Sequence, residues 1–140
     1  MLKGEYQYAL DDKGRVVIPP KFRHALGELV VATRSVDECV SIYSPGEWSK
    51  LEQTLKDLPT KQRDILRYVL AGAVDLEVDR QGRVTLPPHL RQHAKIDRDV
   101  VVVGLVKRLE VWNRSTWTTY LEKSQASARQ LAEQIEDLSI

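Results

Sequence analysis

Hydrophobic residues recur in the same order along the two halves of this chain. In the stretches YQYAL (6–10) and VDLEV (74–78), apolar and polar residues alternate with a period of two, as they do in half-buried β-strands. Three more β-rich stretches follow each of these, separated by turns or short helices. The pattern therefore predicts two series of further strands: 15–18, 29–34 and 40–43 in the first half, and 83–86, 100–106 and 109–112 in the second.

Two kinds of helix are expected in each half. A proline pair ends the second strand and opens a short helix, at KFRHAL (21–26) and HLRQHA (89–94), because proline fits the first helical turn but not the interior of a sheet. A longer amphipathic helix follows the last strand. The Ser-x-x-Glu capping box at 44–47 predicts its start in the first half, and Asn113 is the expected N-cap in the second.

Apolar stripes predict which faces of the helices are buried. The expected stripes are Trp48, Leu51, Leu55 and Leu58 in the first half, and Trp117, Tyr120, Leu121, Ala128, Leu131, Ile135 and Leu138 in the second. The segment TKQRDILRYVLAG (60–72) is expected to form a linking helix that ends at Gly72 as its C-cap. The residues that this helix is expected to bury are Ile65, Leu66, Val69 and Leu70.

The two series belong to an internal duplication. DDKGRVVIPP at 11–20 and DRQGRVTLPP at 79–88 repeat one motif, and the same shift of the sequence aligns Arg23 with Arg91. Two copies favour a pseudo-dimer over a solenoid, which needs at least about three repeats. No Gly/Ser-rich linker separates the copies, so they are expected to pack together. The predicted organisation is a first repeat at 5–58, a linking helix at 59–72 and a second repeat with an extended C-terminal helix at 73–140.

Composition places the chain among ordinary globular proteins. It has 140 residues, of which 42% are apolar and 29% charged, so one compact domain or two small halves sharing a core are expected. No stretch reaches the ~20 apolar residues of a membrane span, and the N-terminus shows no signal-peptide pattern. The single cysteine, Cys39, suits a reducing compartment. These features predict a soluble cytoplasmic protein.

The distribution of charge is more informative than its sum, which is only +1. Two windows, 13–27 and 80–95, each carry four positive charges and no acidic residue, and both lie in the repeated motif. The eight residues concerned are Lys13, Arg15, Lys21 and Arg23 in the first window and Arg80, Arg83, Arg91 and Lys95 in the second.

The motif DxxGRVVIPxxxR resembles the DNA-binding hairpin of the AbrB/SpoVT superfamily of bacterial transcription regulators. Two copies in one chain, each followed by a capped helix with a tryptophan near its start, resemble the MraZ family in particular. The resemblance covers essentially all 140 residues, including YSPGEW (43–48) and the terminal EDLSI (136–140).

This resemblance implies an α+β, β-rich fold: a double-ψ or swapped-hairpin AbrB-like β-barrel formed by the two internal repeats, with peripheral α-helices. It also implies a homo-oligomer in the form of a ring. Such proteins bind repeated short boxes in the promoter of the division and cell-wall gene cluster, usually including their own gene. The expected protein is therefore a nucleoid-associated transcriptional regulator that binds double-stranded DNA, without enzymatic activity, cofactor, metal or membrane partner.

The family signature Asp-x-x-x-Arg falls on Asp11 and Arg15, and again on Asp79 and Arg83. Arginine presents a planar fork of donors that can clamp two phosphate oxygens or the O6/N7 edge of guanine. A carboxylate aimed at DNA would be repelled, so the aspartates are expected to cap turn amides or to orient the arginines. Gly14 and Gly82 are expected to supply the positive φ of the two turns.

The remaining basic residues of the motif are weighed as phosphate contacts. Lys13, Lys21 and Arg80 are expected to face phosphates, which fixes register without reading sequence. Arg23 and Arg91 occupy a further basic position of the superfamily. They are expected either to contact DNA or to lie over the barrel and pair with acids of the other half. The position after them, often a second arginine in the superfamily, is His24 or Gln92 here.

Other chemistry is weaker in this sequence. His89 and His93 have the i, i+4 spacing of zinc helices, but the glutamate of His-Glu-x-x-His is absent, so they are interpreted as solvated. Cys39 has no basic partner in sequence, and the tryptophans are interpreted as packing residues. Two alternatives stay open: an antitoxin that binds DNA and a toxin, and an oligomeric scaffold with incidental DNA binding.

Overall fold

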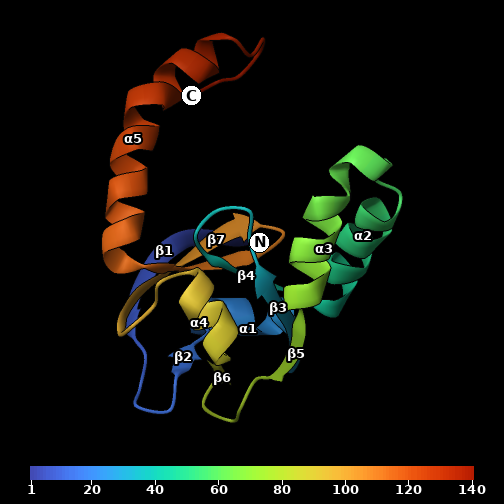
Figure 1. The fold of residues 1–140 in the computed structure, drawn as a ribbon. Coiled ribbons are helices and arrows are strands. Elements are labelled where there is room, and N and C mark those ends of the chain that lie inside the picture. Colours follow the sequence, from blue (N-terminus) through green and yellow to red (C-terminus); the bar gives the residue numbers. More distant parts are fainter.

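Strands from both repeats are interleaved in one six-stranded antiparallel sheet of order β1-β7-β8-β4-β3-β5 (Figure 1). The computed structural model describes residues 1–140. The strands of this sheet are β1 (Leu2–Ala9), β3 (Leu29–Arg34), β4 (Val40–Tyr43), β5 (Val74–Glu77), β7 (Asp99–Val106) and β8 (Leu109–Asn113). The other two strands, β2 (Arg15–Val17) and β6 (Arg83–Thr85), form a separate ribbon. Every strand that the hydrophobic pattern predicted is present.

The first strand of each repeat pairs with a strand of the other repeat. β1 pairs with β7, from Leu2 opposite Val106 to Ala9 opposite Asp99, and β5 pairs with β3. In the middle of the sheet β4 pairs with β8. Neither repeat supplies a partner for its own first strand, so the two repeats form a single structural unit.

The ribbon is also shared between the repeats. β2 and β6 pair antiparallel, and Val16 lies opposite Val84, its equivalent in the duplication. Two further backbone hydrogen bonds extend the pairing: the amide of Ile18 donates to Gly82 O at 2.7 Å, and the amide of Leu86 donates to Gly14 O at 2.9 Å. A local two-fold axis therefore passes between the two valines.

One hydrophobic core of 19 buried residues joins the ribbon to the sheet. Val16 and Val84 enter it from the ribbon, and Phe22 and Leu90 enter it from the short helices α1 (Pro20–Leu26) and α4 (Pro88–His93). Tyr6 on β1 packs edge-on against Phe22, with ring centroids 5.4 Å apart. Because burial of apolar surface stabilises by about 25 cal/mol per Å², this common core holds the two repeats together.

The longer helices extend away from the ribbon (Figure 1). They are α2 (Pro45–Lys56), α3 (Arg63–Gly72) and α5 (Arg114–Glu133). Both predicted N-caps are confirmed. The Ser44 hydroxyl accepts the Glu47 amide at 3.3 Å, and Asn113 Oδ1 accepts the amides of Ser115 at 2.9 Å and Thr116 at 3.2 Å.

The linking segment differs from its prediction in its start, its end and its burial. A 3-10 turn over Thr60–Gln62 precedes α3, and Gly72 is the last helical residue rather than a left-handed C-cap. The reason for a glycine there is a close approach: a Cβ at Gly72 would lie 2.8 Å from Arg34 Nε. Of the side chains expected to be buried, Val69 is buried but Ile65 is exposed.

The C-terminal helix is shorter than its apolar stripe predicted, and more of its apolar side chains are exposed. It ends at Glu133, and Asp137 takes a φ of 64°, so Ile135 and Leu138 lie beyond the helix. Only its base packs on the sheet, where Trp117 lies 5.3 Å from Trp112 between ring centroids. The expected buried stripe is therefore wrong for this chain on its own: Tyr120, Leu121, Leu131, Ile135 and Leu138 are all exposed.

The predicted α+β class is confirmed, with mainly antiparallel strands and five α-helices. The strand ladders divide into a six-stranded sheet and a two-stranded ribbon, so closure into one barrel stays a prediction, as does the swapped-hairpin connection. None of the helices combines the length and the apolar character that crossing a membrane requires.

Candidate nucleic-acid interface

Two glycine turns lie side by side at the end of the molecule that carries the ribbon (Figure 1). The turn at 11–14 connects β1 to β2, and the turn at 79–82 connects β5 to β6. Gly14 has a φ of 75° and Gly82 a φ of 77°, which favours glycine because a side chain is strained in this region. The helices α2, α3 and α5 lie at the other end, so none of these three helices covers the turns.

Asp11 organises the first turn. Its Oδ1 accepts the backbone amides of Lys13 and Arg15, each at 2.9 Å, and its Oδ2 accepts Arg15 Nε. The pKa of Asp11 is lowered to about 2, first because the Arg15 amide donates to the carboxylate and then because the Arg15 side chain does so, against the opposing effect of desolvation. The charged carboxylate therefore fixes both the turn and the arginine.

Asp79 makes the same contacts in the second turn. Its Oδ1 accepts the amides of Gln81 at 2.9 Å and Arg83 at 2.8 Å, and its Oδ2 accepts Arg83 Nε at 2.9 Å. The pKa of Asp79 is lowered, again mainly by the backbone amide of the arginine. Both aspartates thus have the turn-capping geometry that their spacing predicts, and their charge is used inside the protein.

Arg15 and Arg83 keep donors free on the outer side of these pairs. Each arginine uses Nε on its own aspartate, and neither makes a hydrogen bond within the protein through its two terminal nitrogens. Arg83 Nη1 also lies 3.8 Å from the Asp11 carboxylate, which links the two turns electrostatically. Each arginine side chain is about a quarter exposed. Each guanidinium fork is thus oriented by an aspartate through Nε, and its terminal nitrogens can still donate hydrogen bonds to a ligand.

Three further predicted residues flank these forks. Lys13 and Arg80 are exposed in the turns themselves. Lys21 is exposed on α1, with Nζ 5.5 Å from the centre of the Tyr6 ring. None of the three forms an ion pair with an acidic residue of the chain. Their charges are therefore available to an external anion.

Arg23 and Arg91 lie behind the turns. Arg23 Nε donates to Ile18 O at 3.1 Å, and Arg91 Nε donates to Leu86 O at 3.0 Å. Their guanidinium groups cover the two turn glycines, but each covers the glycine of the other repeat: Arg23 lies on Gly82 and Arg91 on Gly14. The sequence does not identify the glycines as the partners in this exchange, because a spacing within one repeat cannot show which group of the other repeat is contacted.

The two histidines of α4 are structural rather than solvated, so that interpretation is wrong. His89 Nε2 lies 2.9 Å from Gly72 O, and His93 bridges the Tyr68 hydroxyl and Asp37 O. Both rings are half-buried and connect α4 to α3 or to the β3–β4 loop. No group of three or more His, Cys, Asp or Glu side chains is arranged to hold a metal ion.

The structure also rules out Cys39 as a nucleophile in this conformation. The thiol is fully buried, and burial raises its pKa, with the carboxylate of Glu110 adding to the effect. Glu110 is itself buried and accepts hydrogen bonds from Arg108 and from Trp112 Nε1. A protonated, enclosed thiol is unreactive.

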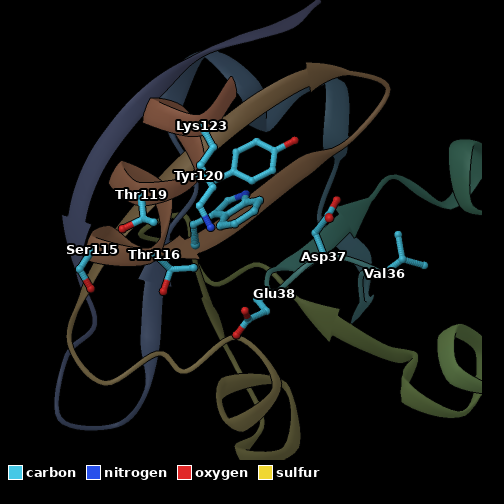
Figure 2. A pocket seen from close by; sticks show the side chains of 9 residues that line it. Val36, Asp37, Glu38, Ser115, Thr116, Thr119, Tyr120 and Lys123 are labelled. Carbon is cyan, nitrogen blue, oxygen red and sulfur yellow. The ribbon is translucent and has the colours of Figure 1, made fainter. Parts of the chain in front are cut away.

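A shallow cavity of about 510 Å³ lies between the β3–β4 loop and the base of α5 (Figure 2). Trp112 and Tyr120 form its apolar wall, and Glu38, at its rim, is paired with Lys95 at 2.8 Å. The nearby Ser115 hydroxyl donates to Asn113. The cavity thus contains no activated nucleophile, and it lies away from the two turns.

The fold and the site together define a class: an internally duplicated α+β protein whose repeats jointly carry one arginine-bearing ribbon. Comparison of the sequence gives the family. The family described as "MraZ protein, putative antitoxin-like" matches residues 1–67 and 69–138. The chain therefore belongs to the MraZ family, as its motifs indicated, and the two matched segments agree with the duplication.

Relatives with full-length similarity carry one name. "Transcriptional regulator MraZ" of Caldanaerobacter subterraneus subsp. tengcongensis is 44% identical over 143 aligned positions, which cover 100% of both chains. The proteins of the same name from Thermoanaerobacter sp. and Syntrophomonas wolfei subsp. wolfei are also 44% identical, with 100% of both chains covered. This family is thus one of transcriptional regulators.

Proposed function

We propose that this protein is a sequence-specific DNA-binding transcriptional regulator that reads DNA through Arg15 and Arg83. The observation that carries the proposal is the pair of guanidinium forks, each fixed by an aspartate through Nε and without a hydrogen bond within the protein at its terminal nitrogens. A two-stranded ribbon is narrow enough for the major groove of B-DNA, and bidentate contact from arginine to guanine O6 and N7 is the commonest specific contact there.

Lys13, Arg80 and Lys21 contact phosphates on either side of the groove in this proposal. They are exposed and free of acidic partners. Phosphate contacts fix the register of a protein on DNA but carry no sequence information. With four to six such contacts, one protomer would bind non-specific DNA with a Kd of about 10⁻⁴–10⁻⁶ M at physiological salt.

The DNA target follows from the family resemblance. We propose repeated short boxes in the promoter of the division and cell-wall gene cluster, including the gene of this protein, so that it acts in the cytoplasm at the nucleoid. Repeated boxes suit a multivalent protein, because linked binding events raise the overall affinity by roughly 10²–10⁴ when their spacing allows simultaneous engagement.

The oligomer, a ring, is supported by uncovered apolar side chains of α5 and of the residues that follow it. Leu131, Ile135 and Leu138 are exposed, and the distal half of α5 projects beyond the sheet (Figure 1). Contiguous exposed apolar surface of this kind marks protein–protein contacts. The proposed occupant is a second copy of this chain.

The swapped-hairpin barrel belongs to the same proposal. Its support is the exchange of strands: β1 pairs only with β7 of the second repeat, and β5 pairs only with β3 of the first. In this arrangement, relatives with one motif per chain contribute one hairpin from each chain. Each of those hairpins corresponds to one repeat of the present chain.

Binding of double-stranded promoter DNA by the Arg15→Ala/Arg83→Ala variant tests the proposed function. Fluorescence anisotropy should show loss of specific binding, because removing one good bidentate contact costs about 1–3 kcal/mol. Arg63→Ala/Arg67→Ala is the matched control, since both residues are exposed on α3 at the other end of the molecule and the charge change is the same. Unchanged affinity of the folded Arg15/Arg83 variant would overturn the proposal.

The antitoxin alternative is favoured by the family description, which includes the word antitoxin. It differs from the proposed function in requiring a protein partner. Co-purification of the tagged chain from its own cells separates the two: a stoichiometric toxin would favour the alternative, and promoter DNA binding by the purified chain alone favours the regulator.

A further inference from the structure

Arg23 and Arg91 are held in a way that differs from the other basic residues of the motif. Each is half-buried, and each donates Nε to a backbone carbonyl five residues earlier, at the end of the ribbon strand of its own repeat. The carbonyls belong to Ile18 and Leu86. A side chain tied to the backbone in this way has lost the free rotation that a lysine or arginine exposed toward DNA retains.

The guanidinium groups then reach the opposite repeat. Arg91 Cζ lies 3.3 Å from the position that a Cβ would take at Gly14, and Arg23 occupies the corresponding space at Gly82. A side chain at Gly82 would displace Arg23, and a side chain at Gly14 would require Arg91 to shift by a few tenths of an ångström. The two glycines are therefore required twice, by a positive φ and by the arginine that covers them.

A backbone hydrogen bond closes each of these units. Gly82 O accepts the Ile18 amide, Ile18 O accepts Arg23 Nε, and the Arg23 guanidinium covers Gly82. The equivalent unit in the other repeat contains Gly14, Leu86 and Arg91. Each arginine thus fixes the turn of the opposite repeat against its own ribbon strand.

We infer that Arg23 and Arg91 are crossed positioning residues: Arg91 holds the turn that carries Arg15, and Arg23 holds the turn that carries Arg83. The inference rests on the proposed function in so far as these turns bind DNA. It differs from a phosphate-contact role for the same residues, because their effect passes through the opposite repeat and not through their own charge.

Hydrogen exchange of the free protein tests the crossing without DNA. In Arg91→Ala, the amides of Gly14 and Arg15 should exchange faster, while those of Gly82 and Arg83 keep their wild-type rates. Arg23→Ala should give the reverse pattern. Acceleration in the turn of the mutated repeat, or in neither turn, would overturn the inference whatever the protein binds.

A double-mutant cycle with promoter DNA tests the consequence for binding. Arg91→Ala should weaken specific binding about tenfold, the effect expected when a charged hydrogen-bonding group is removed. In an Arg15→Ala background the same change should add little, whereas in an Arg83→Ala background it should cost the full factor. Equal costs in the two backgrounds would contradict a path through the Arg15 turn.

The salt dependence of binding separates positioning from contact. Loss of a phosphate contact lowers the slope of log K against log salt by about 0.9. We expect that decrease for Lys21→Ala, the exposed neighbour of Arg23 on α1, and no change of slope for Arg23→Ala. A slope reduced by the same amount in Arg23→Ala would assign it to a phosphate.

Conservative variants keep the test decisive if an alanine variant fails to fold. Arg91→Lys retains the charge and the aliphatic stem but lacks the planar group that covers Gly14 and the Nε donor to Leu86 O. If Arg91 is a positioning residue, Arg91→Lys should bind DNA as weakly as Arg91→Ala. The slope of log K against log salt should then be unchanged. Full rescue of affinity by lysine would overturn the inference.

Discussion

At the scale of single residues, the charged groups of the site divide into those bound within the turns and those without a hydrogen bond in the protein. Asp11 and Asp79 each accept two backbone amides and one arginine Nε, so their charge is bound within the turns although each side chain is about a third exposed. The terminal nitrogens of Arg15 and Arg83 make no hydrogen bond within the protein, although Arg83 Nη1 lies 3.8 Å from the Asp11 carboxylate. A proposed polyanion site can therefore contain two aspartates, because the amides and arginines that they bind offset their charge.

Acid titration tests this division of charge. The carboxyl of Asp11 should titrate with a pKa of about 2 in the folded protein, well below the ordinary value of 3.8. Because the folded-state pKa is depressed, the stabilisation is fully present above about pH 4 and is lost as the pH falls through 2. Carbonyl NMR shifts of Asp11 followed against pH measure it. A midpoint near 3.8 would show that the carboxylate is not held by these amides.

The matched variant Asp11→Asn extends the test to stability. The asparagine side chain can still accept the turn amides through its oxygen but carries no charge for Arg15. Its free energy of unfolding should be lower than that of the wild type at pH 7, and the two should converge as the pH approaches 2. A constant difference in the free energy of unfolding between the two proteins over that pH range would contradict the link between ionisation of Asp11 and stability.

At the scale of elements, glycine is required for different structural reasons at different positions. Gly14 and Gly82 serve turns with positive φ, whereas Gly72 lies at the end of α3 beneath Arg34. Arg34 is fixed there by Nε and Nη2, which donate to Tyr68 O at 3.0 and 2.9 Å. A helical glycine normally costs stability relative to alanine, but here a Cβ would push against the Arg34 side chain.

Gly72→Ala should therefore destabilise the protein by about 1 kcal/mol, because displacement of Arg34 removes charged hydrogen bonds that outweigh the gain in helix propensity. Gly46→Ala in α2 is the control: a Cβ there meets nothing within 4 Å, so it should be neutral or stabilising. In an Arg34→Ala background, Gly72→Ala should no longer destabilise. Chemical denaturation measures all four variants, and destabilisation that persists in that background would contradict the close-approach explanation.

Element patterns also explain what the sequence could and could not predict. The strands and both N-caps were predictable because alternation, proline pairs and capping side chains are local signals. The C-cap at Gly72 was predicted wrongly, since the residue that excludes a Cβ, Arg34, is far away in sequence. The contacts of His89 and His93 with α3 and the β3–β4 loop were missed for the same reason.

At the scale of the whole molecule, the duplication makes one ribbon from two repeats. The symmetric pairing of Val16 with Val84 places the two turns at one end, and the crossed arginines couple each turn to the other repeat. The candidate residues were predictable from the repeated motif. Their grouping was not, because it depends on which repeat supplies the partner strand.

The proposed oligomerisation is also a property of the whole molecule, and substitutions in the C-terminal region test it. Leu131→Glu/Ile135→Glu should break the proposed ring into smaller species, because it places two charges at apolar positions that are exposed in the single chain. Gln130→Glu/Gln134→Glu changes the charge by the same amount on neighbouring positions and should leave assembly intact. Sedimentation velocity measures both variants. Assembly that persists unchanged in the leucine–isoleucine variant would exclude these positions as the contact.

Protection of guanine N7 on the DNA upstream of the gene for this protein is the most direct test of the central claim. Dimethyl sulfate methylates N7 in the major groove, where the forks of Arg15 and Arg83 are proposed to bind. The wild-type protein should protect guanines in regularly repeated short boxes, and Arg15→Ala/Arg83→Ala should protect none. Protection that survives in the double variant, or that is absent with the wild type, would contradict the proposed reading of DNA by this ribbon.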